Sequence, residues 1–285
     1  MGEYSIQRLS NSEEHLKQCA LFLNSEFSES SGFTKQNKAT SDYLNWLYFE
    51  NPRGSAIAFS AYYQREMVSH FATIPVDYEV EGTLRKGLLA LNLVTHPNHR
   101  GKGLFIRVAS ETLDCAKKEG YDFVIGVSNQ NSSYGLINKL GFTLVGQLKV
   151  LVGIGSIIPD YNSSYKLKPV WNKESLQWRL RNPSFEYFLA RKSIAIVPTG
   201  VFGIYAQLTG RKECEKLLFE KGKKTATLRV WIGLTGNIKK KGIFMYLPPI
   251  LKPVPLNFIY RDLKDENKGF KVEDVLFELI DFDAY

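Results

Sequence analysis

The sequence predicts a mixed α/β fold made of two related halves: a complete domain over residues 1–152 and a shortened copy of it over residues 153–285. Three observations predict this fold class. Strand-like and helix-like segments alternate through the first half. A glycine-rich loop joins a β-run to an amphipathic helix, as in a βαβ unit with a right-handed crossover. A Trp and Asn-Pro pattern of the first half returns in the second.

Hydrophobic periodicity places the elements of the first half. Apolar residues at helical spacing, such as Leu16, Cys19 and Leu23, indicate helices, whereas short apolar runs indicate strands. Gly120 and Gly141 end two of the helices. The expected strands cover residues 4–9, 56–63, 67–74 with an onward arm at 76–80, 87–95, 123–127 and 142–152, and the expected helices cover 15–27, 41–48, 105–118 and 132–140.

The repeat is carried by a tryptophan near the end of a helix. Trp46 is followed five residues later by an Asn-Pro pair at 51–52, and Trp178 is followed four residues later by the pair at 182–183. Strand-like segments come next in both places. Chance could produce the echo alone, but the shared strand order favours a duplicated domain whose second copy is shortened. Glycine, proline and serine residues indicate a linker at 153–168.

Composition excludes several classes of protein. No run of about 18 apolar residues occurs, so we expect no membrane span. The N-terminus lacks the basic and apolar regions of a secretory signal. Cys19, Cys115 and Cys214 are odd in number and far apart, which argues against a disulfide framework or a zinc site. We therefore expect a cytoplasmic protein without a metal.

The net charge of +8 is unevenly distributed. Residues 1–150 hold 15 basic and 15 acidic residues, so the remaining 22 basic and 14 acidic residues place the whole excess in the second half. This excess fits either an ordinary solvated surface or an anionic partner, such as a phosphate-bearing substrate, nucleic acid or a lipid headgroup. The cluster of lysines at 239–241 is too short to define a nucleic-acid-binding tract, and we expect no nucleic-acid partner.

The loop Arg100-Gly101-Lys102-Gly103 has the features of an anion site. It lies between a strand and a helix, and the free N–H groups and dipole of a helix N-terminus attract anions. Glycines let a pyrophosphate approach the backbone, and Arg100 and Lys102 add positive charge. The glycine patterns of P-loop and dinucleotide-binding proteins are both absent. An ordinary basic turn before a helix is the alternative.

This loop and its surroundings resemble the GNAT superfamily of acyl-CoA-dependent N-acyltransferases, whose pyrophosphate loop has the pattern [QR]-x-x-G-x-[GA]. The segment 100–105 matches the Arg and the central Gly and departs at Phe105. The strand end at 94–97, the segment Asn129-Gln130-Asn131-Ser132 and the segment 139–142 also resemble that family. The resemblance covers about residues 1–150.

The resemblance implies acetyl-CoA as the co-substrate. The sheet would open between the strand ending near Thr95 and the strand ending near Val127, with the pantetheine arm in the gap. Backbone groups of Leu93, Val94 and Thr95 would pair with the pantetheine amides. The second half lacks such a loop, so one site per chain is expected. The implied contacts to the coenzyme are Leu93, Val94, Thr95, Arg100, Gly101, Lys102, Gly103, Leu104, Phe105 and Asn131.

The catalytic groups are less evident. The family transfers the acyl group directly to an amine, which requires a proton acceptor and a proton donor. Its usual donor, a Tyr, would stand at Ile137, so Tyr134, one turn earlier, is the candidate. The strand 88–93 carries no carboxylate, and Asn92 could only orient a water. His70 and His96 could titrate but are expected to be structural, and Asp281, Asp283 or the carboxylate of Tyr285 is a further hypothesis for the acceptor site.

The resemblance therefore implies an N-acyltransferase acting on a small amine such as an amino sugar. A catalytically silent CoA-binding or scaffolding protein is the alternative, because the family's usual Tyr and Glu are missing. An anion-binding module acting through the second half is a third reading. A homodimer is compatible with the sequence. Tyr246, Phe258 and Tyr260 are candidates for lining an acceptor pocket formed by the second half, although packing in the core is the favoured use of each.

Overall fold

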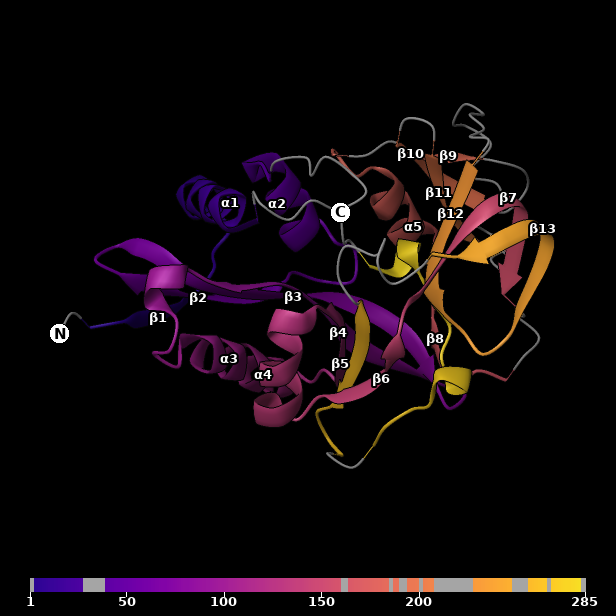
Figure 1. The fold of residues 1–285 in the computed structure, drawn as a ribbon. Helices are drawn as coiled ribbons and strands as arrows, with labels where there is room; N and C mark the ends of the chain where they lie inside the picture. Colours follow the sequence, from indigo (N-terminus) through magenta and orange to yellow (C-terminus); the bar gives the residue numbers. More distant parts are fainter. Residues whose placement is uncertain are drawn as a thin grey trace.

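Two β-sheets organise the chain in the computed structural model (Figure 1). The structure describes residues 3–27, 39–159, 164–184, 187–189, 194–199, 202–207, 228–247, 256–265 and 268–282. Within these ranges no helix has both the length and the apolar character needed to cross a membrane. The mixed α/β class predicted from the sequence is confirmed.

The first sheet has the strand order β1-β2-β3-β4-β5-β14-β6, with β8 paired to β3. Neighbouring strands are antiparallel except for β4 and β5, which are parallel. The expected arm at 76–80 is continuous with the strand before it. The strands are β1 (Ser5–Arg8), β2 (Ile57–Tyr63), β3 (Glu66–Val80), β4 (Thr83–Thr95), β5 (Phe123–Ser128), β6 (Thr143–Gln147), β8 (Leu167–Pro169) and β14 (Asn257–Asp262).

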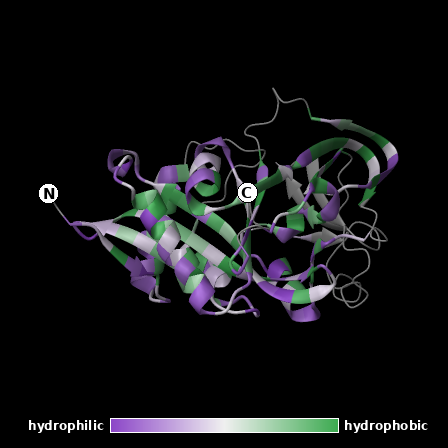
Figure 2. Ribbon diagram, turned by 90° about the horizontal axis from the view of Figure 1, so that it is seen from below, coloured by the Kyte–Doolittle hydropathy of each residue, from purple (hydrophilic) through white to green (hydrophobic). Residues whose placement is uncertain are grey.

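Helices cover both faces of this sheet. Helices α1 (Glu13–Phe27) and α2 (Ser41–Phe49) lie on one face, and α3 (Leu104–Lys118) and α4 (Gln130–Leu140) lie on the other (Figure 1). Each pair buries its apolar side against the strands and forms a separate core. Hydrophobic stretches accordingly gather in the central strands, with hydrophilic residues on the outer helix surfaces (Figure 2). The layers follow from the periodicities of the sequence.

The second sheet has the order β13-β7-β12-β11-β10-β9, with β15 paired to β12. Its β11 and β12 are parallel, like β4 and β5 of the first sheet. The remaining elements are α5 (Lys173–Leu180) and the short 3₁₀ helices η1 (Pro97–His99), η3 (Val272–Asp274) and η4 (Leu279–Asp281). The strands are β7 (Lys149–Pro159), β9 (Phe188–Leu189), β10 (Ile194–Thr199), β11 (Phe202–Gln207), β12 (Leu228–Leu234), β13 (Ile238–Tyr246) and β15 (Phe277–Glu278).

The chain crosses from one sheet to the other several times. Strand β7 follows β6 in the chain but lies between β12 and β13 in the second sheet. Strand β14 follows β13 but lies between β5 and β6 in the first. Arg85 on β4 holds the inserted β14 by an ion pair to the buried Asp262, with 3.2 Å between Nη1 and Oδ2. The two halves are therefore interleaved rather than simply consecutive.

These crossings change two expectations about the middle of the chain. The single strand expected at 142–152 is two strands, β6 and β7, in different sheets. The linker expected at 153–168 is wrong for its first part, because Gly153–Pro159 belongs to β7 and pairs with β13. The glycines there allow close strand packing rather than a flexible connection. The expected boundary between residues 152 and 153 falls inside β7.

The repeated sequence pattern occupies matching places in the fold. Trp46 lies on α2 and Trp178 on α5, and the two rings stack. After each helix the Asn of the Asn-Pro pair makes the same turn. The side-chain oxygen of Asn51 accepts from the N–H of Arg53 at 3.0 Å, and that of Asn182 accepts from the N–H of Ser184 at 2.8 Å. Equivalent local geometry at both positions supports duplication.

Candidate active site

The first sheet opens on the carboxyl side of the β4–β5 pair. The parallel ladder joins 87–90 of β4 to 123–126 of β5 and then stops. Leu91, Val94 and Thr95 of β4 stay paired to β3 on the other side, but no residue of β4 beyond Ala90 has a ladder to β5. A strand edge exposed in this way can pair with an extended ligand, as in β-strand addition. The opening lies where the resemblance to the GNAT superfamily implied the pantetheine arm.

The expected contact residues on this edge are partly engaged by the protein. The carbonyl of Val94 accepts a hydrogen bond from the Ser69 hydroxyl at 3.1 Å. The carbonyl of Thr95 accepts from Nε of Arg100, also at 3.1 Å. Leu93 is half-buried, beside a register shift in β4 opposite 70–72 of β3. This irregularity redirects the backbone at the point where β4 leaves β5.

A buried polar chain supports the irregularity in β4. Asn92 adopts a left-handed φ of 54°, a conformation that Asn tolerates better than most residues. Its Nδ2 donates to the hydroxyl of Tyr48 at 2.6 Å. That hydroxyl lies 3.2 Å from Nε2 of His70, whose Nδ1 lies 2.8 Å from Oγ of Ser60. Four side chains thus connect α2, β2, β3 and β4 inside the core.

Burial keeps this chain neutral. It raises the pKa of the Tyr48 hydroxyl and lowers the pKa of the His70 imidazole to about 3. The structural role expected for His70 therefore agrees with its environment. The hydrogen bond between Asn92 and Tyr48 was not predicted from the sequence. The signal that could have indicated it is a single Asn inside an otherwise apolar β-run.

The glycine loop leads directly into the N-terminus of α3. Gly101 and Gly103 both have φ of 73°, and a Cβ at either would meet nothing within 4 Å. Gly103 is the N-cap, and no side chain caps the first turn. Leu104 is buried, and Phe105 packs so closely against Gly135 that a Cβ there would lie 2.5 Å from the ring. An open helix N-terminus on a fixed base is suited to bind an anion.

Basic side chains surround the loop. Arg100 reaches back to the carbonyl of Thr95 at the end of β4, and Lys102 is exposed. Nζ of Lys102 donates to the hydroxyl of Tyr4 at 2.9 Å, and that hydroxyl lies 2.9 Å from Nδ1 of His99. Partial desolvation, with the nearby Lys102 and His96, lowers the pKa of His99. Both cations therefore stand beside the uncapped helix end.

The candidate residues of α4 share one face of that helix. Asn129 caps the helix by accepting from the N–H groups of Asn131 and Ser132, each at 3.0 Å. The side chains of Asn131 and Tyr134, three residues apart, lie on the same face. Tyr134 is 67% exposed, whereas Ile137, where the family's usual donor would stand, is half-buried. The exposed hydroxyl of Tyr134 is therefore accessible to a ligand.

Several other residues that were candidates for the site are buried and have structural contacts. Phe258 and Tyr260 are fully buried in β14 and do not line a pocket, because β14 lies inside the first sheet. The carboxylate of Asp281 is buried and accepts from Nε1 of Trp171 and the N–H of Glu278, both at 2.8 Å. It is thus held as a structural group, which argues against its role as a base. Asp283 and Tyr285 lie outside the described residues.

His96 has a structural role at the end of β4. Its Nδ1 accepts from the N–H of Asn98 at 3.3 Å and so caps η1. Its Nε2 lies 4.0 Å from Oε1 of Glu26 on α1. The expected structural assignment fits these contacts.

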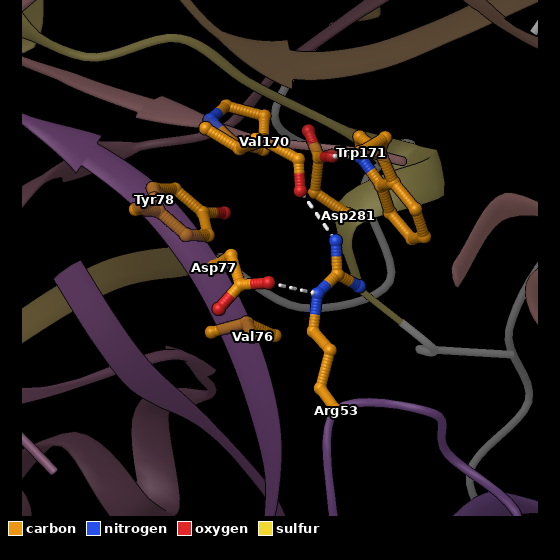
Figure 3. Close-up of a pocket in the computed structure, with 8 residues that line it drawn as sticks. Arg53, Val76, Asp77, Tyr78, Val170, Trp171 and Asp281 are labelled. Carbon is orange, nitrogen blue, oxygen red and sulfur yellow. Dashed lines mark hydrogen bonds and ion pairs between the residues drawn. The ribbon is translucent and has the colours of Figure 1, made fainter. Parts of the chain in front are cut away.

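A small pocket lies away from the loop, where β3 meets the second half (Figure 3). The Arg53 guanidinium occupies it and donates from Nε to Asp77 at 2.9 Å and from Nη2 to the carbonyl of Val170. The same group stacks over Trp171, 5.0 Å from the ring centre. Two of the three guanidinium nitrogens thus donate to groups on either side, and the contact joins β3 to the segment before α5.

Within the described part of the chain, no group of three or more His, Cys, Asp or Glu side chains could hold a metal ion. The features that could bind a ligand are therefore an open strand edge, an uncapped helix N-terminus, two cations and an exposed tyrosine. This combination defines a site for an extended molecule with an anionic end.

Residues 13–145 match the family model described as an acetyltransferase (GNAT) domain. The first half of the chain therefore matches a GNAT acetyltransferase domain, as the resemblance implied, and this match supports acyl transfer as the class of activity. No protein with a curated description matches the sequence.

Solved structures share the fold over nearly the whole chain. One, from Enterococcus faecalis V583, is described as a conserved protein of unknown function and probable N-acyltransferase. It has 10% identity and a TM-score of 0.59, with coverage of 92% of this chain and 73% of that one. A GCN5-related N-acetyltransferase from Kribbella flavida has 10% identity, coverage of 92% and 72%, and a TM-score of 0.56. Another, from Anabaena variabilis, has 11% identity, coverage of 92% and 73%, and a TM-score of 0.53. At such low identity the likeness concerns the fold.

Proposed function

We propose that the chain transfers an acetyl group from acetyl-CoA directly to a small amine, for example an amino sugar. The observation that carries this proposal is the continuity between the β4–β5 opening and the loop at 101–103. The pantetheine arm would lie along β4 beyond Ala90, and the pyrophosphate would lie on the first turn of α3 near Lys102. Asn131 would contact the pantetheine from α4. The acetyl thioester would then lie toward the interior of the opening.

The chemistry requires one bond to form and one to break. The amine nitrogen attacks the thioester carbonyl carbon, and the C–S bond then breaks to release CoA as a thiolate. The nitrogen loses a proton, and the thiolate gains one. Tyr134 is the proposed donor to the thiolate, because its hydroxyl is exposed on α4. Asn92 could orient a water that receives the amine proton, since its side chain is held by Tyr48.

The second half is proposed to complete the acceptor site. Residues 153–285 would be a second, shortened copy of the first domain, and its helix α5 contacts α2 of the first copy through Trp46 and Trp178. Such a contact fixes the second copy against the helices that cover one face of the first sheet. The free thiols of Cys19 and Cys115 and the use of acetyl-CoA support a cytoplasmic location.

Turnover can be tested by measuring CoA release from acetyl-CoA with a panel of amino sugars and other small amines, and by identifying the acetylated product by mass spectrometry. The proposal predicts an N-acetylated product with one CoA released per acetyl transferred. Release of CoA without an acetylated amine would indicate simple hydrolysis and would contradict it.

A catalytically silent CoA-binding protein is favoured by one observation, the presence of Ile137 where the family's usual tyrosine donor would stand. Measurements of acetyl-CoA binding and of CoA release distinguish the two functions. The silent protein would bind acetyl-CoA but release no CoA with any amine of the panel. The proposed enzyme would do both.

A further inference from the structure

Strands β7 and β13 form a ribbon at the end of the molecule away from β1 (Figure 1). Their ladder runs from the pair Leu151–Tyr246 to the pair Pro159–Ile238. The ladder from β7 to β12 ends at Gly153. Beyond that residue β7 pairs with β13 alone among the described strands, so the distal part is a two-stranded ribbon. Two strands by themselves bury little surface, which makes the chemistry of each face informative.

One face of the ribbon packs inward. Leu151 and Ile157 of β7 form a small core with Trp231 of β12, and Ile238 and Phe244 of β13 pack against it. The glycines of the ribbon share this face by strand alternation. A Cβ at Gly153, Gly155 or Gly242 would come within 2.0 to 2.2 Å of a carbonyl oxygen of the opposite strand. Glycine at these places allows the ribbon to bend over its core.

The outer face is apolar and exposed. Ile154 and Ile243 lie opposite each other in the register and are 58% and 80% exposed, and Met245 on the same face is 71% exposed. A few large apolar side chains grouped on a convex edge are unusual for an unpartnered surface. Alternation continues the same face through Lys241 and Lys239, both exposed. The apolar group is thus followed directly by cations.

The charged residues of β7 and β13 are all lysines, one at 149 and three in succession at 239–241. Lys239 and Lys241 lie on the outer face with the apolar group, whereas Lys240 lies on the other face, with its Nζ 4.6 Å from the ring centre of Tyr246. The outer face therefore combines an exposed apolar group with two lysines. This combination is characteristic of elements that lie on anionic membranes, where apolar side chains enter the headgroup region and lysines contact lipid phosphates.

We infer that the outer face of the β7–β13 ribbon docks on an anionic lipid surface. A second copy of the chain fits this face poorly, because a symmetric contact would bring the two lysine-rich ribbons together. Nucleic acid would attract the lysines but would leave Ile243 and Met245 exposed to water. A lipid surface satisfies both the charge and the apolar side chains. The docking would hold the acyl-transfer site of the first half near a membrane, but the inference does not depend on catalysis.

The test is co-sedimentation of the full chain with phosphatidylcholine vesicles, prepared with and without phosphatidylglycerol. The chain is expected to bind only the anionic vesicles, with binding that weakens as salt is added. Each lysine near an anionic surface contributes about fivefold to partitioning, so Lys239→Gln/Lys241→Gln should weaken binding about 25-fold. Ile243→Ser/Met245→Ser should also weaken it, and the residual binding should vanish at high salt.

The matched control is Lys117→Gln/Lys118→Gln, which removes the same charge from exposed positions at the end of α3. It should bind vesicles as the unaltered chain does, and unchanged CoA affinity should show that every variant is folded. Absence of binding to anionic vesicles would overturn the inference. Equal weakening by both lysine pairs would also overturn it, because it would indicate attraction by net charge alone. The inference would also be overturned if the chain formed a dimer in solution and Ile243→Ser/Met245→Ser dissociated that dimer.

Discussion

Trp46 and Trp178 bind each other reciprocally. The indole Nε1 of Trp46 donates to the carbonyl of Trp178 at 3.1 Å, and Nε1 of Trp178 donates to the carbonyl of Trp46 at 3.0 Å. Their rings stack with centres 4.9 Å apart and an interplanar angle of 21°. Each is the sixth residue of its helix, in α2 or α5. Reciprocal contacts between equivalent residues are the mark of a two-fold relationship, in this case between two halves of one chain.

Replacing one of these indoles should destabilise the whole chain. Trp178→Phe keeps an aromatic ring but leaves the buried carbonyl of Trp46 without its donor, which costs about 1–3 kcal/mol. Trp46→Phe should cost less, because the carbonyl of Trp178 still accepts from the N–H of Arg181 at 3.0 Å. Urea unfolding followed by fluorescence and circular dichroism should show a single transition in each case, because the chain crosses between the sheets at β7 and β14.

Tyr134→Phe serves as the reference for this experiment, because it removes an exposed hydroxyl and should change the free energy of unfolding by less than about 0.5 kcal/mol. Two separate transitions in the unaltered chain, or no loss of stability in either tryptophan variant, would argue against the reciprocal contact as a link between the halves.

The first sheet could be predicted closely because its elements have local signatures. Periodicity located α1 to α4 and β1 to β5 to within a few residues, and the glycine loop marked the start of α3. The duplication was also visible, since Trp46 and Trp178 are each followed by an Asn-Pro pair. Such patterns depend only on residues that are close in the sequence, so one sequence is enough to detect them.

The crossings between the sheets could not be predicted in the same way. Strand β14 pairs with β5 about 130 residues away, and nothing local in residues 257–262 selects β5 over a neighbour in the second half. The core packing favoured for Phe258 and Tyr260 is confirmed by their burial, but the central strand that buries them could not be located from the sequence. The link from Tyr48 to Asn92 was missed for a similar reason, because it depends on three-dimensional packing between α2 and β4.

His70 should make stability depend on pH. Burial lowers its pKa from 6.5 to about 3, so the unfolded chain binds a proton in this interval while the folded chain does not. The free energy of unfolding should therefore be unaffected by this group above about pH 6.5. It should decrease as the pH falls from 6.5 toward 3, by about 1.4 kcal/mol per pH unit. Urea unfolding at several pH values between about 6 and 5 measures this slope.

The variant His70→Gln isolates this effect, because it keeps a polar side chain but removes the titrating group. Its free energy of unfolding should fall less steeply with decreasing pH than that of the unaltered chain, whatever its absolute stability. Identical slopes for the two proteins would mean that His70 does not remain neutral in the fold.

Lys102 should contribute to binding of the pyrophosphate rather than the pantetheine. Lys102→Gln removes an exposed cation beside the start of α3 and should weaken CoA binding by about 1 kcal/mol, or about fivefold. S-acetylpantetheine, which lacks the pyrophosphate, should bind both proteins equally. Lys118→Gln at the other end of α3 is the matched control. An equal effect on both ligands would place Lys102 elsewhere than at the phosphates.

Tyr134 should affect the chemical step and not the binding of the donor. A general acid contributes about 10²–10⁴-fold, so Tyr134→Phe should lower kcat by at least about tenfold while leaving the affinity for acetyl-CoA unchanged. The removed hydroxyl is exposed, so folding should not suffer. Tyr121→Phe, at the end of α3 opposite the glycine loop, is the control. A kcat equal to that of the unaltered enzyme would remove Tyr134 from the mechanism.

The central claim is that acetyl-CoA lies on the loop at 101–103 and the first turn of α3. Calorimetry of acetyl-CoA binding to the unaltered chain, Gly103→Trp and Gly120→Trp tests it most directly. Both glycines have left-handed φ, 73° and 85°, and a Cβ at either meets nothing within 4 Å, but they lie at opposite ends of α3. The backbone strain is therefore matched at about 1–2 kcal/mol. We predict that Gly103→Trp abolishes binding while Gly120→Trp preserves it; equal affinity in all three proteins would contradict the proposed site.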